Sequence, residues 1–564
     1  MFVVFEGIDG SGKTTLSNRV AKALGESSLS VKHLRADGRF ASSVTEAIRE
    51  LCRDSRHLEL VPQTEFLLYV AREVQLTEEV LKPALAEHDV VIADRFLDTP
   101  RVLARHGRHL PSSWTEPVLE AASQGIVPDL VVLVDVDPAL ARARRKAGKL
   151  LANDKRPPSR KGLAGVGLQH RLRRGYLELA AAEPSRWLVV DNEGALEETV
   201  AELTRLLRET HELGAPAALA RSRRVRREPA SPAARGPSSV REALEHFLAA
   251  IERRSEREPH VAARLLAGLY GPRVDERRGR LARIVPEAVL DGLVGLADAS
   301  SFEIRAAYAA DLPRAVARSL AGLSLDERAA RLRRELVEKA PLDVASVLGA
   351  LEDDEAWAIR ERAYELDPGL VTGSLGRIGS ARAWEWRERW LGRAPKLGDD
   401  YEASRVAAKS VAALDDDRAW AIRDAARPAA PVAALASVTR LVSERSFALR
   451  RRMLRAAPKV VMETLRGIAD PRAAELRRAV ASDCKEALDS VYGLDGEDAW
   501  ALREEHALRW PSTVIKSLGP LADGPRGRAL VDRVLVEPAS GVSLLKHLSA
   551  IALGCHVVST PETL

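Results

Sequence analysis

The sequence is poor in aromatic residues and in cysteine, and it has no long apolar run. Of its 564 residues, 4% are aromatic and three are cysteine: Cys52, Cys484 and Cys555. Thiols this far apart have neither metal-ligand spacing nor the density of a disulfide scaffold, so we expect a reducing cytoplasm. No stretch of 18 apolar residues occurs, which excludes a membrane-spanning helix. We expect no signal peptide, because no basic and apolar leader precedes the first strand-like run.

The chain also lacks a large excess of charge of one sign. It has 86 basic and 81 acidic residues, a formal net charge of +5, and an isoelectric point near 9.1. This mild excess is not typical of a dedicated nucleic-acid-binding protein, although a protein with phosphate-ester ligands can show it. Arg, Ala, Leu and Glu are abundant, which favours helix. The length predicts more than one domain.

Three segments of different composition and pattern follow one another along the chain. Residues 1–210 alternate short β-rich runs (FVVFE, VKHLR, DVVIAD, LVVLVD, WLVVD) with amphipathic stretches, which predicts a parallel sheet covered by helices. Residues 211–239 contain the basic, Pro/Ser/Ala-rich run RSRRVRREPASPAARGPSS, which predicts a flexible linker. Residues 240–564 are predicted to be entirely helical. The expected fold class is an α/β parallel-sheet domain followed by an all-α domain.

A phrase resembling AWAIR recurs about every 27 residues in the third part. A second apolar phrase that begins with Ser or Thr follows about 17 residues later, and a proline often lies between the two. Each unit is predicted to be a pair of helices, and such pairs must stack into a solenoid similar to short HEAT repeats. We expect the tryptophans of the phrase to pack inside and the arginines after them to form a solvated face. The anchor position of the phrase falls at Phe302, Ala330, Trp357, Trp384, Trp420, Phe447, Ala474, Trp500 and Arg528.

The stretch GIDGSGKT matches the phosphate-binding motif G-x-x-x-x-G-K-[ST] in full. A strand-like run precedes it and an amphipathic run follows, which is the context that this motif requires. Glycines let backbone N–H groups close around phosphate oxygens, Lys13 reaches the β- and γ-phosphates, and the Thr14 hydroxyl ligates Mg²⁺. The residues predicted to bind ATP here are Gly7, Ile8, Asp9, Gly10, Ser11, Gly12, Lys13, Thr14 and Thr15.

Residues 1–210 resemble the bacterial thymidylate kinases, which belong to the P-loop nucleoside monophosphate kinases. The resemblance runs in order through FEGIDGSGKTT, TEFLLYVAREVQLTEEVLKPALAEHDVVIADR, IVPDLVVLVDVDPALARAR and HRLRRGYLELAAAEPSRWLVVD. It implies ATP-dependent, Mg²⁺-assisted phosphorylation of dTMP to dTDP. It also implies a homodimer formed through this domain.

The resemblance assigns roles to individual residues. Asp94 ends a strand beside the P-loop and holds Mg²⁺ through water, together with Thr14. Arg144 lies near the donor nucleotide. The residues implied to bind the acceptor are Asp9, Arg35, Leu68, Arg72 and Arg95, of which Arg35 and Arg95 clamp its phosphate.

A catalytic arginine is also expected. Some family members carry it inside the P-loop, where this chain has Gly10, so we expect it in the lid-like stretch 149–162. The candidates there are Lys155, Arg156, Arg160 and Lys161. We predict that Arg156 and Arg160 act catalytically together with Lys13, Asp9 and Arg95.

The residues that read the nucleobase depart from the family pattern. Leu103 and Ala104 stand where a tyrosine and a glutamine are usual, and Leu68 replaces a stacking phenylalanine. Losing groups that pair with the base relaxes or shifts selectivity. Three hypotheses therefore stay open: a dTMP kinase, a kinase for another nucleoside monophosphate, and a nucleotide-gated scaffold or sensor with little turnover. For the repeats we favour a protein partner over nucleic acid.

Overall fold

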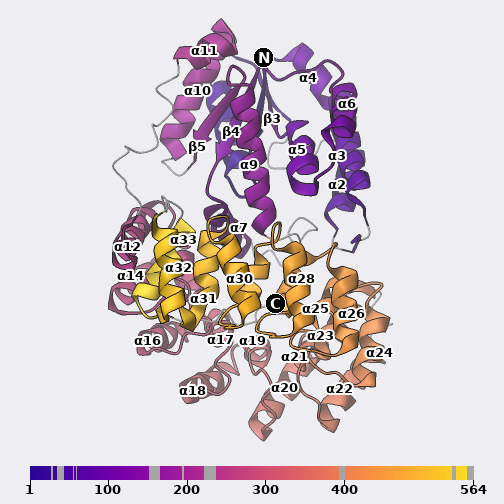
Figure 1. The fold of residues 1–564 in the computed structure, drawn as a ribbon, viewed down its shortest axis with the longest axis vertical. Helices are drawn as coiled ribbons and strands as arrows, with labels where there is room; N and C mark the ends of the chain where they lie inside the picture. Colours follow the sequence, from indigo (N-terminus) through magenta and orange to yellow (C-terminus); the bar gives the residue numbers. More distant parts are fainter. Residues whose placement is uncertain are drawn as a thin grey trace. The chain divides into compact units, whose positions relative to one another are not determined.

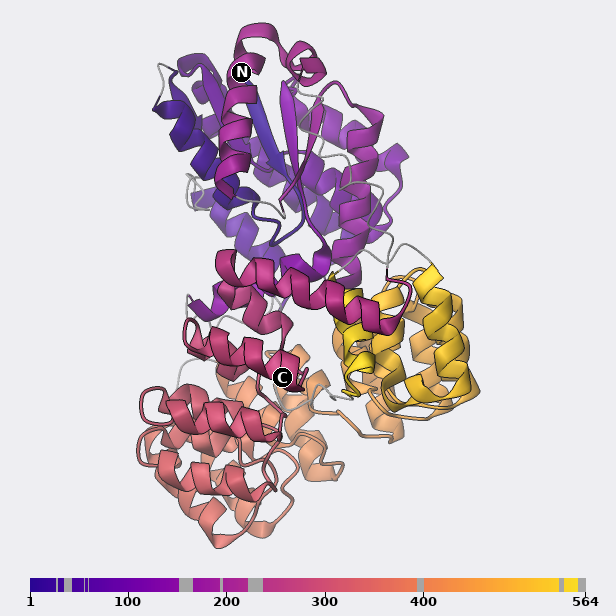
Figure 2. The ribbon, with the colours of Figure 1, turned by 90° about the vertical axis from the view of Figure 1, so that its left-hand side faces the viewer.

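In a computed structural model, the described residues are 1–26, 29–34, 43–54, 56–58, 60–151, 166–192, 196–221, 237–392, 400–536 and 542–555. They fall into two compact units (Figures 1 and 2). The first is built from residues up to 148 together with 166–221, and the second from residues 237–555. Arg35 and the four lid candidates Lys155, Arg156, Arg160 and Lys161 lie outside the described residues.

The first unit is built on a five-stranded, all-parallel sheet with the order β2-β3-β1-β4-β5, which confirms the predicted α/β class. The central strands read as continuous apolar runs because helices bury both of their faces. The strands are β1 (Phe2–Glu6), β2 (Val31–His33), β3 (Val90–Asp94), β4 (Leu130–Asp135) and β5 (Trp187–Asp191).

Helices cover both faces of this sheet. One face packs against α1 and α10 in a core that includes Phe5, Leu16 and Leu206. Side chains alternate across a strand, so Glu6 projects from the face opposite Phe5, where α5 and α9 lie. The helices are α1 (Lys13–Gly25), α2 (Ser43–Arg53), α3 (Pro62–Leu76), α4 (Lys82–Glu87), α5 (Asp98–Val102), α6 (Ser112–Ser123), α7 (Pro138–Leu151), α9 (Val166–Ala182), α10 (Leu196–Leu213) and α11 (Ala215–Arg221). Two π-helical segments, η2 (Thr77–Leu81) and η3 (Leu103–Gly107), continue α3 and α5.

The helices of the first unit extend past residue 210. Helix α10 crosses that position, and Ala215 and Ala218 of α11 are buried in the same core as Leu206. The described part of this unit therefore continues to residue 221.

The second unit is helical, as predicted, and each anchor of the repeated phrase lies in the first helix of a pair. These first helices are α14 (Pro272–Ala282), α16 (Ala299–Tyr308), α18 (Glu327–Leu336), α20 (Asp354–Leu366), α22 (Ala381–Leu391), α24 (Asp417–Ala426), α26 (Glu444–Met453), α28 (Pro471–Val480), α30 (Glu497–His506) and α32 (Pro525–Val536). The anchor tryptophans are buried, so they are packing residues.

The second helix of most pairs begins with a proline at its first position, where the missing N–H is not needed. These second helices are α13 (Pro259–Leu265), α15 (Pro286–Asp291), α17 (Pro313–Ser319), α19 (Pro341–Ser346), α21 (Pro368–Ser374), α23 (Asp400–Ser410), α25 (Pro431–Ala436), α27 (Pro458–Thr464), α29 (Glu486–Ser490), α31 (Pro511–Leu518) and α33 (Val542–Ala552). Helix α12 (Val240–Arg257) is the first helix of the first pair, with α13 as its second, and the 3₁₀ helix η6 (Gly519–Asp523) follows α31.

The arginines of the repeated phrase are buried, so the prediction of a solvated face is wrong. Arg450 of α26 donates from Nε to Thr464 Oγ1 at 3.0 Å, from Nη1 to Leu441 O at 2.8 Å and from Nη2 to Val438 O at 2.8 Å. One guanidinium therefore caps the carboxyl ends of two successive second helices, α25 and α27. The same arrangement recurs at Arg305, Arg387, Arg423, Arg477 and Arg503.

The array of repeats closes on itself. Helix α12 packs along α33, and Figure 1 shows the two side by side. Ser549 Oγ donates to Ala243 O at 3.5 Å, and Lys546 Nζ donates to Ala267 O at 2.6 Å. Tyr270 OH donates to Gly554 O at 3.3 Å. We call these contacts between α12–α13 and α33 with the residues that follow it the seam.

Among the residues that the structure describes, none of the helices is both long enough and apolar enough to cross a bilayer.

Candidate functional site

The candidate site lies at the carboxyl ends of β1 and β3. These strands are parallel neighbours, so Glu6 at the end of β1 and Asp94 at the end of β3 reach the same edge of the sheet. Ligands of open α/β sheets bind at this edge. The P-loop follows β1 there and leads into α1, whose first residue is Lys13.

The P-loop is fixed by close contacts that only glycine permits. Gly10 and Gly12 have φ values of 91° and 93°, in the left-handed region. A Cβ on Gly10 would lie 2.3 Å from Ala141 O of α7, and one on Gly12 would lie 2.4 Å from Asn192 Nδ2. Ser11 Oγ is buried and has no hydrogen-bond partner among the described residues, as expected of a group that faces a ligand.

Lys13 is buried beneath the loop. Its Nζ donates to Ile8 O at 3.3 Å. Burial, and then the charge of Arg95, lower the pKa of Lys13 to about 8. Bound phosphates would add negative charge beside Lys13 and so favour its charged ammonium form.

Thr14 and Asp94 fit a magnesium ion. Thr14 Oγ1 donates to Asp94 Oδ2 at 2.5 Å, which brings a hydroxyl and a carboxylate together beside the P-loop. Oxygen donors of this kind are the ligands that Mg²⁺ takes, usually with retained waters and substrate phosphates. The two residues predicted from the sequence as the metal pair are therefore adjacent in space.

Arg95 and Asp9 meet on the acceptor side. Arg95 Nη2 donates to Asp9 Oδ1 at 2.6 Å, and its Nη1 donates to Thr99 Oγ1 at 3.0 Å and to Tyr176 OH at 3.3 Å. The backbone of Arg95 has φ 80°, a conformation that costs free energy outside glycine and that clusters at functional sites.

Glu6 belongs to the same group of contacts. Its carboxylate accepts from Phe96 N at 3.1 Å and from Thr99 Oγ1 at 2.8 Å, and it lies 3.6 Å from Arg95 Nη1. Burial raises the pKa of Glu6 to about 7 despite the opposing charge of Arg95. The site thus holds two groups that titrate near neutral pH.

Thr99 and Tyr176 were not singled out from the sequence. Tyr176 lies in a segment that carries the family resemblance, whereas Thr99 follows the segment that ends at Arg95; the available signal for both was a polar residue within a buried helix. Tyr176 lies on α9, which follows the lid-like stretch, and it is 2% exposed.

Two other predicted acceptor residues, Arg72 and Leu68, lie on α3. Arg72 is buried on α3, where it forms an ion pair with Glu73 and lies 5.0 Å from the centroid of the Tyr69 ring. Leu68 is half-buried on the same helix. Leu103, at the position where the family has a tyrosine, is buried in η3.

The donor side is organised by Asn192, which the sequence analysis missed. Asn192 follows β5, and its Nδ2 donates to Ser11 O of the P-loop at 2.7 Å. Arg144 of α7, predicted to lie near the donor, donates from Nη1 to Asn192 O at 3.0 Å. The only sequence signal was a polar residue directly after the last strand of the sheet.

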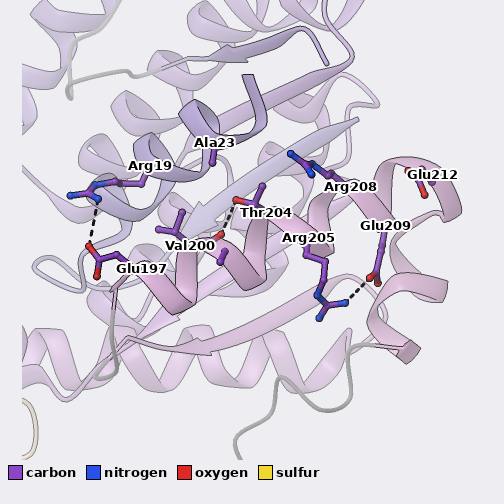
Figure 3. Close-up of a pocket in the computed structure, with 10 residues that line it drawn as sticks. Arg19, Ala23, Glu197, Val200, Thr204, Arg205, Arg208, Glu209 and Glu212 are labelled. Carbon is purple, nitrogen blue, oxygen red and sulfur yellow. Dashed lines mark hydrogen bonds and ion pairs between the residues drawn. The ribbon is translucent and has the colours of Figure 1, made fainter. Parts of the chain in front are cut away.

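A hollow of about 500 Å³ lies elsewhere on this unit, between α1 and α10 (Figure 3). Arg19 and Glu197 form an ion pair across it at 3.6 Å, and Arg205 pairs with Glu209 at 2.6 Å. None of the predicted site residues lines this hollow. It is not part of the candidate site.

The comparisons with known proteins agree with this geometry. The thymidylate kinase family model matches residues 5–203. The chain is 39% identical over 198 residues to a thymidylate kinase of Desulforudis audaxviator, which covers 34% of this chain and 83% of that protein. It is 36% identical over 208 residues to a thymidylate kinase of Geobacter sulfurreducens, which covers 36% of this chain and 95% of that protein.

A third relative, a thymidylate kinase of Solidesulfovibrio magneticus, is 35% identical over 191 residues, which covers 34% of this chain and 90% of that protein. The family model ends at residue 203, so the helical repeats lie beyond it. With the parallel sheet, the P-loop and nearly whole relatives aligned, the chain belongs to the thymidylate kinase family.

Proposed function

We propose that the chain transfers the γ-phosphoryl group of ATP to dTMP, giving ADP and dTDP. One observation carries the proposal: Lys13, Thr14 and Asp94 gather at the P-loop, and the Asp9–Arg95 contact lies beside them at the same edge of the sheet. Donor-phosphate groups and acceptor-phosphate groups are thus neighbours, as an in-line transfer requires.

The proposed step needs little covalent chemistry from the protein. An oxygen of the dTMP phosphate attacks the γ-phosphorus, the bond from that phosphorus to its bridging oxygen breaks, and ADP leaves. Lys13 follows the charge of the β- and γ-phosphates, and Arg95 and Arg35 hold the acceptor phosphate in line. Mg²⁺, held through Thr14 and Asp94, would neutralise charge on the phosphates. Arg156 and Arg160 stay predicted as lid groups that stabilise the transferring phosphoryl group.

The test is turnover with a panel of acceptors. Purified full-length protein is given Mg-ATP and each nucleoside monophosphate in turn, and ADP release is measured. We expect dTMP to be phosphorylated and a Lys13→Ala variant to lose about 10³-fold or more, because the phosphates lose their cation. No dTMP turnover above the Lys13→Ala background would refute the proposed activity.

A different acceptor is the second candidate, and Leu68, Leu103 and Ala104 favour it. Apolar side chains at these positions offer no donor or acceptor to a base edge, so they discriminate weakly between bases. Turnover of another monophosphate in the same panel, with dTMP inactive, would support this candidate. Binding of ATP without any turnover would support a nucleotide-gated scaffold.

We also propose a homodimer through the kinase unit. Helices α2 and α6 both pack against α3, and each of the three carries an exposed large apolar side chain: Leu51 on α2, Leu67 on α3 and Trp114 on α6, with exposed fractions of 40%, 45% and 37%. Exposed large apolar side chains on helices packed in this way are the kind of surface that a protein interface covers. We expect light scattering to give a dimer mass, Leu67→Glu to give a monomer, and Leu213→Glu on α10 to leave the dimer intact.

For the repeats we propose a protein partner. For the chain we propose three parts, 1–210, 211–239 and 240–564, with the start of the second part, helix α11, packed on the core of the first. A cytoplasmic location is proposed as well, and it is supported by three cysteines that are present as thiols rather than in disulfides: Cys52, Cys484 and Cys555.

A further inference from the structure

The P-loop position that carries an arginine in some family members is closed to any side chain here. Gly10 has φ 91°, and a Cβ on it would lie 2.3 Å from the carbonyl oxygen of Ala141. The same Cβ would lie 2.8 Å from Cγ of Arg145. Helix α7 therefore packs directly against the loop, and the aliphatic stem of Arg145 occupies the space next to Gly10.

Arg145 differs from its neighbour in what it contacts. Arg144 donates to Asn192 O and is half-buried. Arg145 is exposed and, within the described part of the chain, makes no hydrogen bond or ion pair. Its guanidinium is thus an uncommitted cation at the edge of a phosphate-binding loop.

The stem of Arg145 is held in place by the rest of the donor side. Arg144 fixes α7 to Asn192, and Asn192 Nδ2 fixes Ser11 O of the loop at 2.7 Å. Two hydrogen bonds therefore link α7, the end of β5 and the P-loop, and they restrict where the stem of Arg145 lies relative to the loop. A charge that is already in place costs no reorganisation when the phosphoryl group moves.

We propose that Arg145 is a catalytic residue: its guanidinium contacts the β- and γ-phosphate oxygens and stabilises the charge that develops during transfer. It supplies from α7 the cation that cannot come from position 10, alongside the lid residues. This inference rests on the proposed kinase activity, and it assigns a role to a residue that neither the P-loop motif nor the lid prediction includes.

The test compares Arg145→Ala with a matched control, Arg142→Ala, an exposed arginine on the same helix. Full-length variants are assayed at saturating Mg-ATP and dTMP, and binding of a fluorescent ADP analogue is measured in parallel. We expect kcat of Arg145→Ala to fall about 100-fold, because one such arginine is worth about 10³-fold or more when it acts alone. Binding of the ADP analogue should change less than about threefold, and Arg142→Ala should stay within about twofold on both measures.

Two further measurements separate chemistry from folding. Added guanidinium ion should restore part of kcat to Arg145→Ala and none to Lys13→Ala. Wild-type protein should form a tight complex with ADP, aluminium fluoride and dTMP that Arg145→Ala does not form, since this complex mimics the transferring phosphoryl group.

The inference is overturned if Arg145→Ala keeps more than a third of kcat, or if kcat and ADP-analogue affinity fall by the same factor. Failure of the proposed function looks different, because wild-type protein itself would not turn over dTMP. In that event the same comparison is made on the acceptor that is turned over or on the hydrolysis of ATP alone. If ATP is not consumed under any of these conditions, both proposals fail.

Discussion

At the scale of single residues, the site holds several ionisable groups close together and away from water, and burial shifts the pKa of two of them. Burial raises the pKa of Glu6 to about 7 and lowers that of Lys13 to about 8, and both lie against Arg95. Each shift reflects the cost of holding a charge away from water. Phosphates entering between Lys13 and Arg95 would relieve the repulsion between these two cations.

The binding of ADP should therefore depend on pH through Lys13. Phosphates bind the ammonium form, so affinity is full below the free-state pKa of about 8 and is lost as the pH rises above it. We expect the dissociation constant to rise about tenfold per pH unit above 8, because one proton must then be taken up on binding. Calorimetric titration with ADP from pH 6.5 to 9.5 measures this.

A Lys13→Arg variant, whose side chain stays charged throughout, serves as the control and should show little change over the same range. Glu6→Gln removes the other group that titrates nearby, and it should leave the loss above pH 8 in place. A flat profile for the wild-type protein would contradict the prediction.

At the scale of elements, the repeats are joined by arginines rather than by apolar contacts alone. The Phe447 ring of α26 lies between Arg450 of its own helix, at 5.0 Å, and Arg472 of the next first helix, at 4.2 Å. Arg450 also caps two second helices, so a single side chain ties three helices together. Carbonyls at helix carboxyl ends carry partial negative charge, which is how a guanidinium without a carboxylate partner is tolerated inside.

Adjacent arginines on α26 provide a direct test. Arg450 is fully buried, whereas the side chain of Arg451 is 46% exposed and pairs with Glu444. We expect Arg450→Ala to lower the stability of the repeat unit by about 3–5 kcal/mol, since it leaves a cavity and several unsatisfied carbonyls. Arg451→Ala should cost less than about 1 kcal/mol.

Chemical denaturation of the full-length protein, followed by tryptophan fluorescence, gives both values. Arg450→Lys should resemble Arg450→Ala, because an ammonium cannot reach the carbonyls that the guanidinium spans. Equal effects of Arg450→Ala and Arg451→Ala would show that the buried arginine is not what joins the repeats.

At the scale of the whole molecule, the seam changes the expected behaviour of the repeats. An open array behaves as a one-dimensional chain, in which each repeat contacts only its neighbours and the ends fray. The seam gives the first and last helices a neighbour each, through residues about 300 positions apart such as Ser549 and Ala243. Opening one end should therefore loosen the other.

A charge placed in the seam tests this coupling. Leu548 of α33 is fully buried, so Leu548→Asp should separate α33 from α12. We expect hydrogen exchange by mass spectrometry to show faster exchange in α12 and α13, far away in sequence, and unchanged exchange in α20–α22. Ala550→Asp, at a half-buried position of the same helix, is the control. Unchanged protection of α12 in Leu548→Asp would mean that the seam does not couple the ends.

What the sequence determined by itself was local. Contiguous sequence patterns encode the P-loop, the strand that ends at Asp94 and the 27-residue repeat. Such patterns determine backbone geometry and periodicity. The parallel sheet followed from the alternation of β-rich and amphipathic runs. The roles given to Arg35, Arg156 and Arg160 stay predictions, since these residues lie outside the described part of the chain.

What only the tertiary structure decided were contacts between residues far apart in the chain. Asn192 reaches the P-loop across 181 positions, the seam joins helices across about 300, and Arg145 meets Gly10 because α7 packs on the loop. The repeat arginines show the same limit, because an arginine at helical spacing is compatible with a solvated face and with a buried cap. Which of the two occurs depends on whether helix ends from neighbouring repeats converge on the side chain, and a period along the sequence does not contain that information.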